Sequence, residues 1–231
     1  MIQISNLSKK YGETVFFSDL NYTFENACIY GLVGRNGAGK TTLLNILSNY
    51  DKNYTGVISI DRKKMNKVDY LDMPVAYAMD QPSFFNELTI YENLLLIASS
   101  RKIKKQEAFD KIERILDGLG LKKYENYSPL ELSKGTMQRL NNACAMIQEE
   151  KITIFDEPFS GLDPVQMKLL ENVIVEFHKK EKGIYIISSH DIECLQNVCD
   201  KCLLLHNGQI REINMEEVDR EEIAKILSEG E

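Results

Sequence analysis

The chain has 231 residues, 43% hydrophobic and 27% charged, which is ordinary for a globular protein of one large domain or two closely joined ones. Its formal net charge of -7 argues against a protein that coats duplex nucleic acid, because such binding comes largely from lysine and arginine neutralising phosphates. No apolar run approaches the roughly 18 residues of a membrane helix, and the first residues lack the apolar core of a secretory signal, so we expect no membrane span.

The first 33 residues alternate short apolar stretches with turn residues, which is typical of antiparallel strands. The last of these stretches, residues 28–33, leads directly into a glycine-rich segment. Residues 54–60 predict a further strand of the same small sheet. We therefore expect an N-terminal antiparallel β part that feeds one strand into a larger core.

The glycine-rich segment, residues 34–42, reads GRNGAGKTT and fits the phosphate-loop pattern G-x-x-x-x-G-K-[ST]. Its glycines let the backbone turn successive N–H groups toward a polyphosphate, and a following helix adds positive charge at its N-terminus. Lys40 is suited to bridge the terminal phosphates, and the Thr41 hydroxyl to ligate the Mg²⁺ that accompanies a nucleoside triphosphate. The alternative is a glycine-rich turn with an exposed lysine. The residues predicted to bind the nucleotide here are Gly34, Asn36, Gly37, Ala38, Gly39, Lys40, Thr41 and Thr42.

Residues 82–150 differ in kind, because apolar residues recur at helical spacing almost throughout and predict an inserted helical subdomain. Strand and helix patterns then alternate to the end of the chain. We expect strands at 152–155, 184–188 and 202–205, and helices at 165–177, from about 191, and over the acidic residues 212–231.

This alternation predicts an α/β fold, namely a P-loop NTPase core with a mostly parallel sheet, a small antiparallel β subdomain and the inserted α-helical subdomain. The core is expected to comprise residues 1–81 and 151–211. The acidic C-terminal helix forms a third segment.

The strand at 152–155 ends in two adjacent acids, Asp156 and Glu157. At a strand end their side chains point to different sides, so Asp156 is suited to hold Mg²⁺ and Glu157 to act on a water that attacks the terminal phosphate. Standing alone, an Asp-Glu-Pro segment is as readily a simple turn. Together with the glycine-rich loop, the pair predicts nucleotide hydrolysis.

Further motifs follow in an order that resembles the nucleotide-binding subunits of the ATP-binding cassette (ABC) transporter family. They are LSKGTMQRL at 132–140, SGLD at 160–163, SSH at 188–190, AMDQP at 78–82 and the aromatic Tyr11 in KKYG. The resemblance spans about residues 1–211. It implies an ATPase that uses ATP and Mg²⁺.

The resemblance also assigns roles to residues outside the loop. It implies that His190 reaches the γ-phosphate, that Gln81 senses Mg²⁺ and the attacking water, and that Tyr11 stacks on adenine. Ser133, Gly135 and Asp163 are implied to contact the nucleotide held by a second subunit. Plainer readings exist for four of these residues: Ser133 and His190 as capping residues, Gln81 as a loop amide and Tyr11 as a core aromatic.

Two consequences follow from the implied family. A site completed by a second subunit predicts a dimer around ATP, and the lack of a membrane span predicts a separate transmembrane permease as partner, which would hold the chain at the inner face of the cell membrane. We expect a transporter subunit, with export favoured by the LSKG signature. The alternative is an ABC-type ATPase that regulates a membrane signalling or cell-wall remodelling complex without solute transport. One departure is noted: Lys134 and Thr136 replace the glycine and glutamine usual in the family signature.

Overall fold

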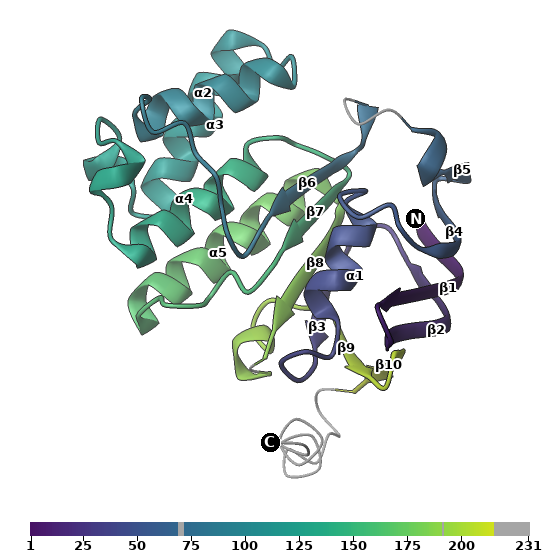
Figure 1. The fold of residues 1–231 in the computed structure, drawn as a ribbon. Helices are drawn as coiled ribbons and strands as arrows, with labels where there is room; N and C mark the ends of the chain where they lie inside the picture. Colours follow the sequence, from purple (N-terminus) through teal and green to yellow (C-terminus); the bar gives the residue numbers. More distant parts are fainter. Residues whose placement is uncertain (69–71, 191, 215–231) are drawn as a thin grey trace.

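The computed structural model describes residues 1–68, 72–190 and 192–214, and it places them in two sheets and five α-helices with short 3-10 turns (Figure 1). A four-stranded sheet has the order β2-β1-β4-β5, and a six-stranded sheet has the order β10-β9-β3-β8-β7-β6. The strands are β1 Ile2–Tyr11, β2 Thr14–Phe24, β3 Cys28–Val33, β4 Thr55–Ile60, β5 Lys63–Lys64, β6 Val75–Ala78, β7 Ile152–Phe155, β8 Ile184–Ser189, β9 Lys201–His206 and β10 Gln209–Ile213.

The small sheet is antiparallel, as the alternating stretches predict, and its first two strands are longer than expected. The register between β1 and its neighbours shifts at Asn6, which has a φ of 51°. Gly56 of β4 lies directly against this irregularity, since a Cβ at Gly56 would be 2.4 Å from the Asn6 carbonyl oxygen. A bulge of this kind bends β1 without ending it, so the apolar stretches merge into one strand.

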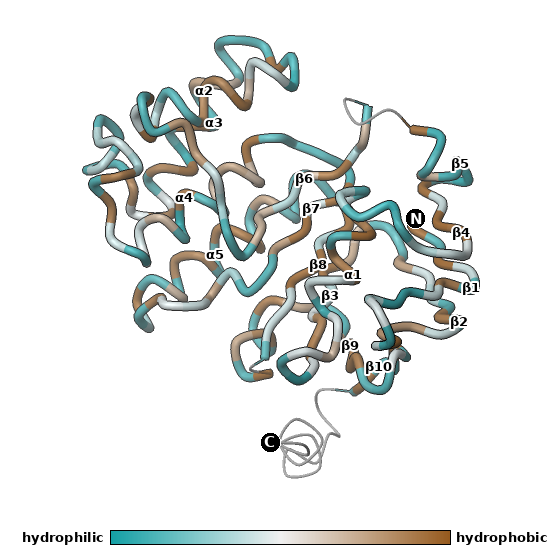
Figure 2. The backbone as a smooth tube through the Cα atoms, viewed as in Figure 1, coloured by the Kyte–Doolittle hydropathy of each residue, from teal (hydrophilic) through white to brown (hydrophobic). Residues whose placement is uncertain are grey.

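The large sheet is the centre of the molecule. Strands β6, β7, β8, β3 and β9 run parallel, and β10 returns antiparallel beside β9. Every residue of β3, β7 and β8 is buried, which is expected for parallel strands covered on both faces. Figure 2 shows hydrophobic segments along β7 and β8. The predicted α/β fold with a mostly parallel sheet is confirmed.

Two hydrophobic clusters cover the two faces of this sheet. One cluster joins β3 to helix α1 (Lys40–Leu47) and to the small antiparallel sheet. The other joins the opposite side chains of β3, such as Ile29 and Val33, to four helices. These are α2 Ile90–Ser100, α3 Lys105–Gly118, α4 Lys134–Met146 and α5 Pro164–Glu181.

Helix starts follow local capping chemistry. Thr89 and Glu92 form a capping box at α2, Ser133 accepts a hydrogen bond from the Thr136 N–H at α4, and Asp163 does the same for Gln166 at α5. Among the described residues, no helix combines the length and apolar character needed to cross a bilayer.

Two predicted helices are corrected. The helix expected from about residue 191 is a 3-10 turn, Glu193–Leu195, because the chain must return to β9 within a few residues and packs Leu195 tightly on Gly31. A helix does not begin at residue 212, since residues 212 and 213 belong to β10. They pair with β9 there, and residues 215–231 of that predicted helix lie outside the described residues.

Candidate functional site

The glycine-rich segment forms the turn between β3 and α1. Gly37 and Gly39 have φ values of 81° and 99°, in the left-handed region that residues with a side chain rarely adopt. A Cβ on Gly34 would lie 2.9 Å from the Leu205 carbonyl oxygen, so β9 passes too close for a larger residue. The backbone therefore meets the N-terminus of α1 in the arrangement that binds phosphate groups.

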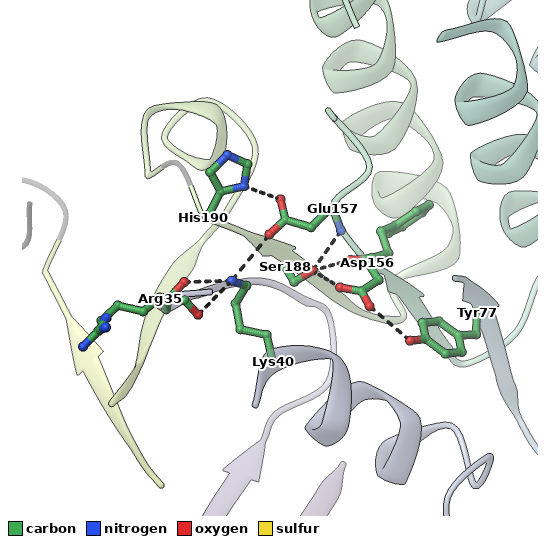
Figure 3. A network of polar contacts seen from close by, with 9 residues as sticks. Arg35, Lys40, Tyr77, Asp156, Glu157, Ser188 and His190 are labelled. Carbon is green, nitrogen blue, oxygen red and sulfur yellow. Dashed lines mark hydrogen bonds and ion pairs between the residues drawn. The ribbon is translucent and has the colours of Figure 1, made fainter. Parts of the chain in front are cut away.

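Lys40, Glu157 and His190 form a chain of polar contacts above this turn (Figure 3). The buried Lys40 Nζ donates to the Gly34 carbonyl at 2.7 Å and lies 3.5 Å from Glu157 Oε1. The other carboxylate oxygen, Glu157 Oε2, lies 2.9 Å from His190 Nδ1. Glu157 itself has a φ of 49°, a strained conformation for a residue other than glycine that is typical of functional positions.

Asp156 lies behind Glu157 and is buried. Ser188 Oγ donates to Asp156 Oδ1 at 2.6 Å and accepts from the Glu157 N–H at 2.9 Å, so one hydroxyl holds both acids (Figure 3). The Tyr77 hydroxyl lies 3.4 Å from Asp156 Oδ2. Burial raises the pKa of Asp156, while hydrogen bonds from Ser188 and Thr41 act in the opposite direction.

These groups surround a cavity of about 360 Å³. Eight of the predicted site residues line it: Asn36, Gly37, Gly39, Lys40, Thr41, Thr42, Glu157 and His190. Four further lining residues carried no predicted role: Phe16, Arg35, Asp80 and Ser160. Gly34 borders the cavity through its bond to Lys40, Ala38 lines an adjoining cavity, and Asp156 is joined to Glu157 through Ser188.

Besides Gly34, Ala38 and Asp156, five predicted site residues are not among those that line this cavity: Tyr11, Gln81, Ser133, Gly135 and Asp163. Tyr11 donates its hydroxyl to Asp51 at 2.5 Å and is about half exposed. Its ring meets Phe16 edge-on, with centroids 5.6 Å apart. Of these two aromatic side chains, it is therefore Phe16 that the fold brings to the cavity.

The signature segment opens helix α4, where Ser133 and Lys134 are exposed. Thr136 is buried, with its hydroxyl 2.9 Å from Ser133 Oγ, and so the departure from glutamine fixes the capping serine. Gly135 lies against the Gly161 carbonyl, because a Cβ on Gly135 would be 3.1 Å from that oxygen. The signature and the Ser160–Asp163 segment thus adjoin on one surface.

The middle of α4 bonds to the loops that border the cavity. Asn141 Nδ2 donates to the Met79 carbonyl at 2.7 Å, and Asn142 Nδ2 donates to the Pro158 carbonyl at 3.2 Å. Gln138 Nε2 donates to the carbonyl of Glu157 at 3.3 Å. The helix that begins at the signature therefore also holds the backbone on both sides of the acidic strand end.

Three residues near the two acids or the cavity, Ser188, Tyr77 and Asp80, have no role that the sequence predicts. Ser188 falls within the SSH motif, but nothing in the sequence pairs its hydroxyl with both acids across two strands. Tyr77 reads as an apolar strand residue, and only the β6–β7 pairing brings its hydroxyl to Asp156. Asp80 precedes Gln81 directly, and a one-residue difference in where a loop turns decides which side chain faces the cavity.

Comparison with known proteins agrees with this geometry. The model of the ABC transporter family matches residues 17–160. An ABC transporter ATP-binding protein of Methanocaldococcus jannaschii is 31% identical over 208 residues, covering 90% of this chain and 75% of the relative. A bacitracin transport ATP-binding protein of Enterococcus faecalis is 30% identical, covering 95% and 71%. A tungstate uptake system ATP-binding protein of Peptoclostridium acidaminophilum is 29% identical, covering 91% and 97%.

Solved structures share the fold. The structure of an ATP-binding subunit of an ABC transporter has a TM-score of 0.85 at 26% identity, covering 100% of this chain and 95% of that one. A dimeric bacterial ABC transporter cassette has a TM-score of 0.81 at 23% identity, covering 93% and 98%.

A phosphate-binding turn with an adjoining pair of acids defines the class of P-loop ATPases. The chain belongs to the ABC transporter family, as one of its ATP-binding subunits. It is an ABC ATPase, which hydrolyses ATP to ADP and phosphate.

Proposed function

We propose that the chain binds Mg²⁺-ATP in the cavity above the glycine-rich turn and, as a dimer, drives a separate membrane permease. The observation that carries the proposal is the contact chain from Lys40 through Glu157 to His190. A lysine from the phosphate loop, a strained carboxylate and a histidine meet there around one cavity. The carboxylate and the histidine come from the ends of neighbouring parallel strands, where α/β proteins bind ligands.

The donor set fits a magnesium nucleotide. The Thr41 side chain hydrogen-bonds the Asp156 carboxylate, so two hard oxygen ligands lie together, one of them on a residue that lines the cavity. When bound, Mg²⁺ neutralises charge on the phosphates. Phe16 lines the cavity beside the turn and Tyr11 packs edge-on against Phe16, and we propose that the base stacks in their neighbourhood.

The protein side chains divide the work of hydrolysis. Lys40 neutralises the terminal phosphates, and because its Nζ now lies near Glu157, phosphate binding draws that positive charge away from the carboxylate. Glu157 is then free to orient a water and accept its proton. His190 donates to Glu157 through Nδ1 and, when both ring nitrogens carry a proton, donates through Nε2 toward the γ-phosphate as its charge grows.

The test replaces the carboxylate with its amide. Glu157→Gln should slow ATP hydrolysis by about a hundredfold or more, since a positioned base contributes that much. ADP affinity should change little, because Lys40 and the glycine backbone remain. In sedimentation with saturating Mg²⁺-ATP, this variant should run as a dimer, and a strictly monomeric species would count against the dimer proposal.

The dimer accounts for residues that lie away from the cavity. Ser133 and Asp163 are exposed at the starts of α4 and α5, on a surface that the cavity of their own chain does not use. We propose that this surface, with Gly135, closes over the nucleotide of a second copy. Capping and anion binding then use the same helix N-termini.

The proposed membrane partner has a matching surface beside the helices. Exposed Phe85, Tyr127 and Leu130 come from two adjoining loops, which are tied together by the bond from Ser128 Oγ to the Asn86 carbonyl at 2.8 Å. Exposed aromatic side chains of this kind are typical of docking sites. We therefore propose that the helical subdomain, residues 82–150, receives the permease, and that the chain works at the inner face of the membrane.

Export is the direction proposed, on the LSKG signature alone, while relatives of nearly equal identity are named for bacitracin transport and for tungstate uptake. Co-purification of a membrane protein and measurement of ATP-dependent solute movement in vesicles test both transport and its direction. A partner that moves no solute would favour the regulatory alternative.

A further inference from the structure

The loop after β6 presents an aspartate, rather than the adjacent glutamine, to the phosphate cavity. Asp80 lines that cavity together with Thr41 and Glu157. Gln81 is exposed and does not belong to the residues that line it. A neutral amide was expected at this point of the site, and the fold supplies an acid.

The backbone leading to Asp80 is fixed by its neighbours. Strands β6 and β7 are parallel, with Ala78 opposite Phe155, and the Asp156 N–H donates to the Ala78 carbonyl at 2.9 Å. The next carbonyl, that of Met79, accepts from Asn141 at 2.7 Å. The chain therefore leaves the sheet directly beside Asp156, and Asp80 is the first residue after these two fixed points.

The charge of Asp80 reaches the acid at the back of the cavity. Burial is the main cause of the raised pKa of Asp156, and the charges of Glu157 and Asp80 add to it. Burial and Asp156 raise the pKa of Tyr77, and Asp80 contributes there as well. Asp80 is therefore within electrostatic reach of both Asp156 and Tyr77.

We propose that Asp80 is a metal-selecting residue of the nucleotide site: its carboxylate faces the divalent cation that enters with the nucleotide, and makes binding depend strongly on that cation. The inference rests on the proposed magnesium-nucleotide site. Carboxylate oxygens are the ligands that Mg²⁺ and Mn²⁺ prefer, and a negative charge repels a nucleotide that arrives without a metal. Within the described part of the chain, no group of three His, Cys, Asp or Glu side chains could hold a metal ion alone, so the phosphates must supply the remaining ligands.

The experiment compares Asp80→Asn with wild type and with Glu87→Gln, an exposed acid of the same loop that controls for net charge. Mn²⁺ binding to the protein with saturating ADP is followed by the EPR signal of free Mn²⁺. ADP binding is measured by calorimetry in Mg²⁺ and in EDTA. We expect Asp80→Asn to weaken Mn²⁺ binding about tenfold and to strengthen metal-free ADP binding several-fold, since one negative charge is removed at short range. Glu87→Gln should change neither.

Three outcomes would overturn the inference. An Asp80→Asn protein with wild-type values in both measurements excludes a role for the carboxylate. A Gln81→Ala protein that shows these shifts while Asp80→Asn does not returns the role to the glutamine. A wild-type protein whose ADP binding is equal with and without metal refutes the magnesium site itself, whereas wild-type metal dependence with a silent Asp80→Asn refutes only the inference. Thermal unfolding without nucleotide checks that each variant is folded.

Discussion

Removal of the Ser188 hydroxyl is the most direct test of how the acidic pair is held. Ser188 is fully buried, so water cannot easily replace its bonds to Asp156 and to the Glu157 N–H. Loss of a bond to a charged group costs about 1.5–3 kcal/mol, and a buried N–H left without an acceptor about 1–3 kcal/mol. Because the two losses share one small site, we expect Ser188→Ala to lower the free energy of unfolding by about 3 kcal/mol. For a chain of this size that is a fall of about 6–12 °C in the midpoint of thermal unfolding.

Hydrolysis should fall further than stability alone would require. Both acids lose their common support, and a displacement of about 1 Å in a reacting group can cost a hundredfold in rate. Thr153→Val is the matched control, because it removes a buried hydroxyl from β7 that bonds to Tyr185 instead. The control should unfold earlier than wild type and keep its ATPase rate once folded. A Ser188→Ala protein with wild-type unfolding and wild-type turnover would refute the reasoning.

Two further predictions concern other parts of the chain. Tyr77→Phe removes the hydroxyl near Asp156. In calorimetry it should weaken ADP affinity in Mg²⁺ several-fold, and in urea unfolding it should lower the free energy of unfolding by about 1 kcal/mol. An ADP affinity in Mg²⁺ equal to that of wild type would contradict this prediction. Burial acts to raise the pKa of Asp51, but bonds from Lys9 and Tyr11 prevail and hold that pKa below its ordinary value. Asp51 therefore stabilises the fold above about pH 4, and the stabilisation is lost as the pH falls through its folded pKa. Asp51→Asn should accordingly be less stable than wild type at pH 7, and the difference should shrink as the pH falls below about 4 in urea titrations; a constant difference would exclude the ionised form as the cause.

The sequence was most informative where chemistry and local pattern coincide. The strand at 28–33, the turn at 34–42 and the strand at 152–155 were all predicted with their observed bounds or nearly so, because fully apolar runs next to glycine or acids leave few alternatives. The helical stretch within 82–150 was also clear, although the limits of its three helices depend on caps such as Thr89.

What the sequence could not provide is how side chains face one another across strands. From the sequence, either Asp80 or Gln81 could face the cavity. The β6–β7 register and the bond from Asn141 decide which of the two does so. The same holds for Phe16, which reaches the cavity because β2 packs beside Gly39 of the turn. The composition around Glu193–Leu195 predicts a helix, while the short return path to β9 allows only a 3-10 turn.

Two parts of helix α4 belong to different sites. Its first residues lie on the surface proposed to meet a second copy, and its middle residues bond to the backbone at Met79, Glu157 and Pro158. In a symmetric pair closed as proposed, the first residues of each α4 would lie over the nucleotide of the neighbouring copy. The middle residues of the same helix would support the nucleotide site of their own chain. A displacement at Ser133 would be transmitted through the first turns of the hydrogen-bonded helix to Gln138, Asn141 and Asn142. A movement at one ATP site of such a pair would therefore reach the other site through helix α4.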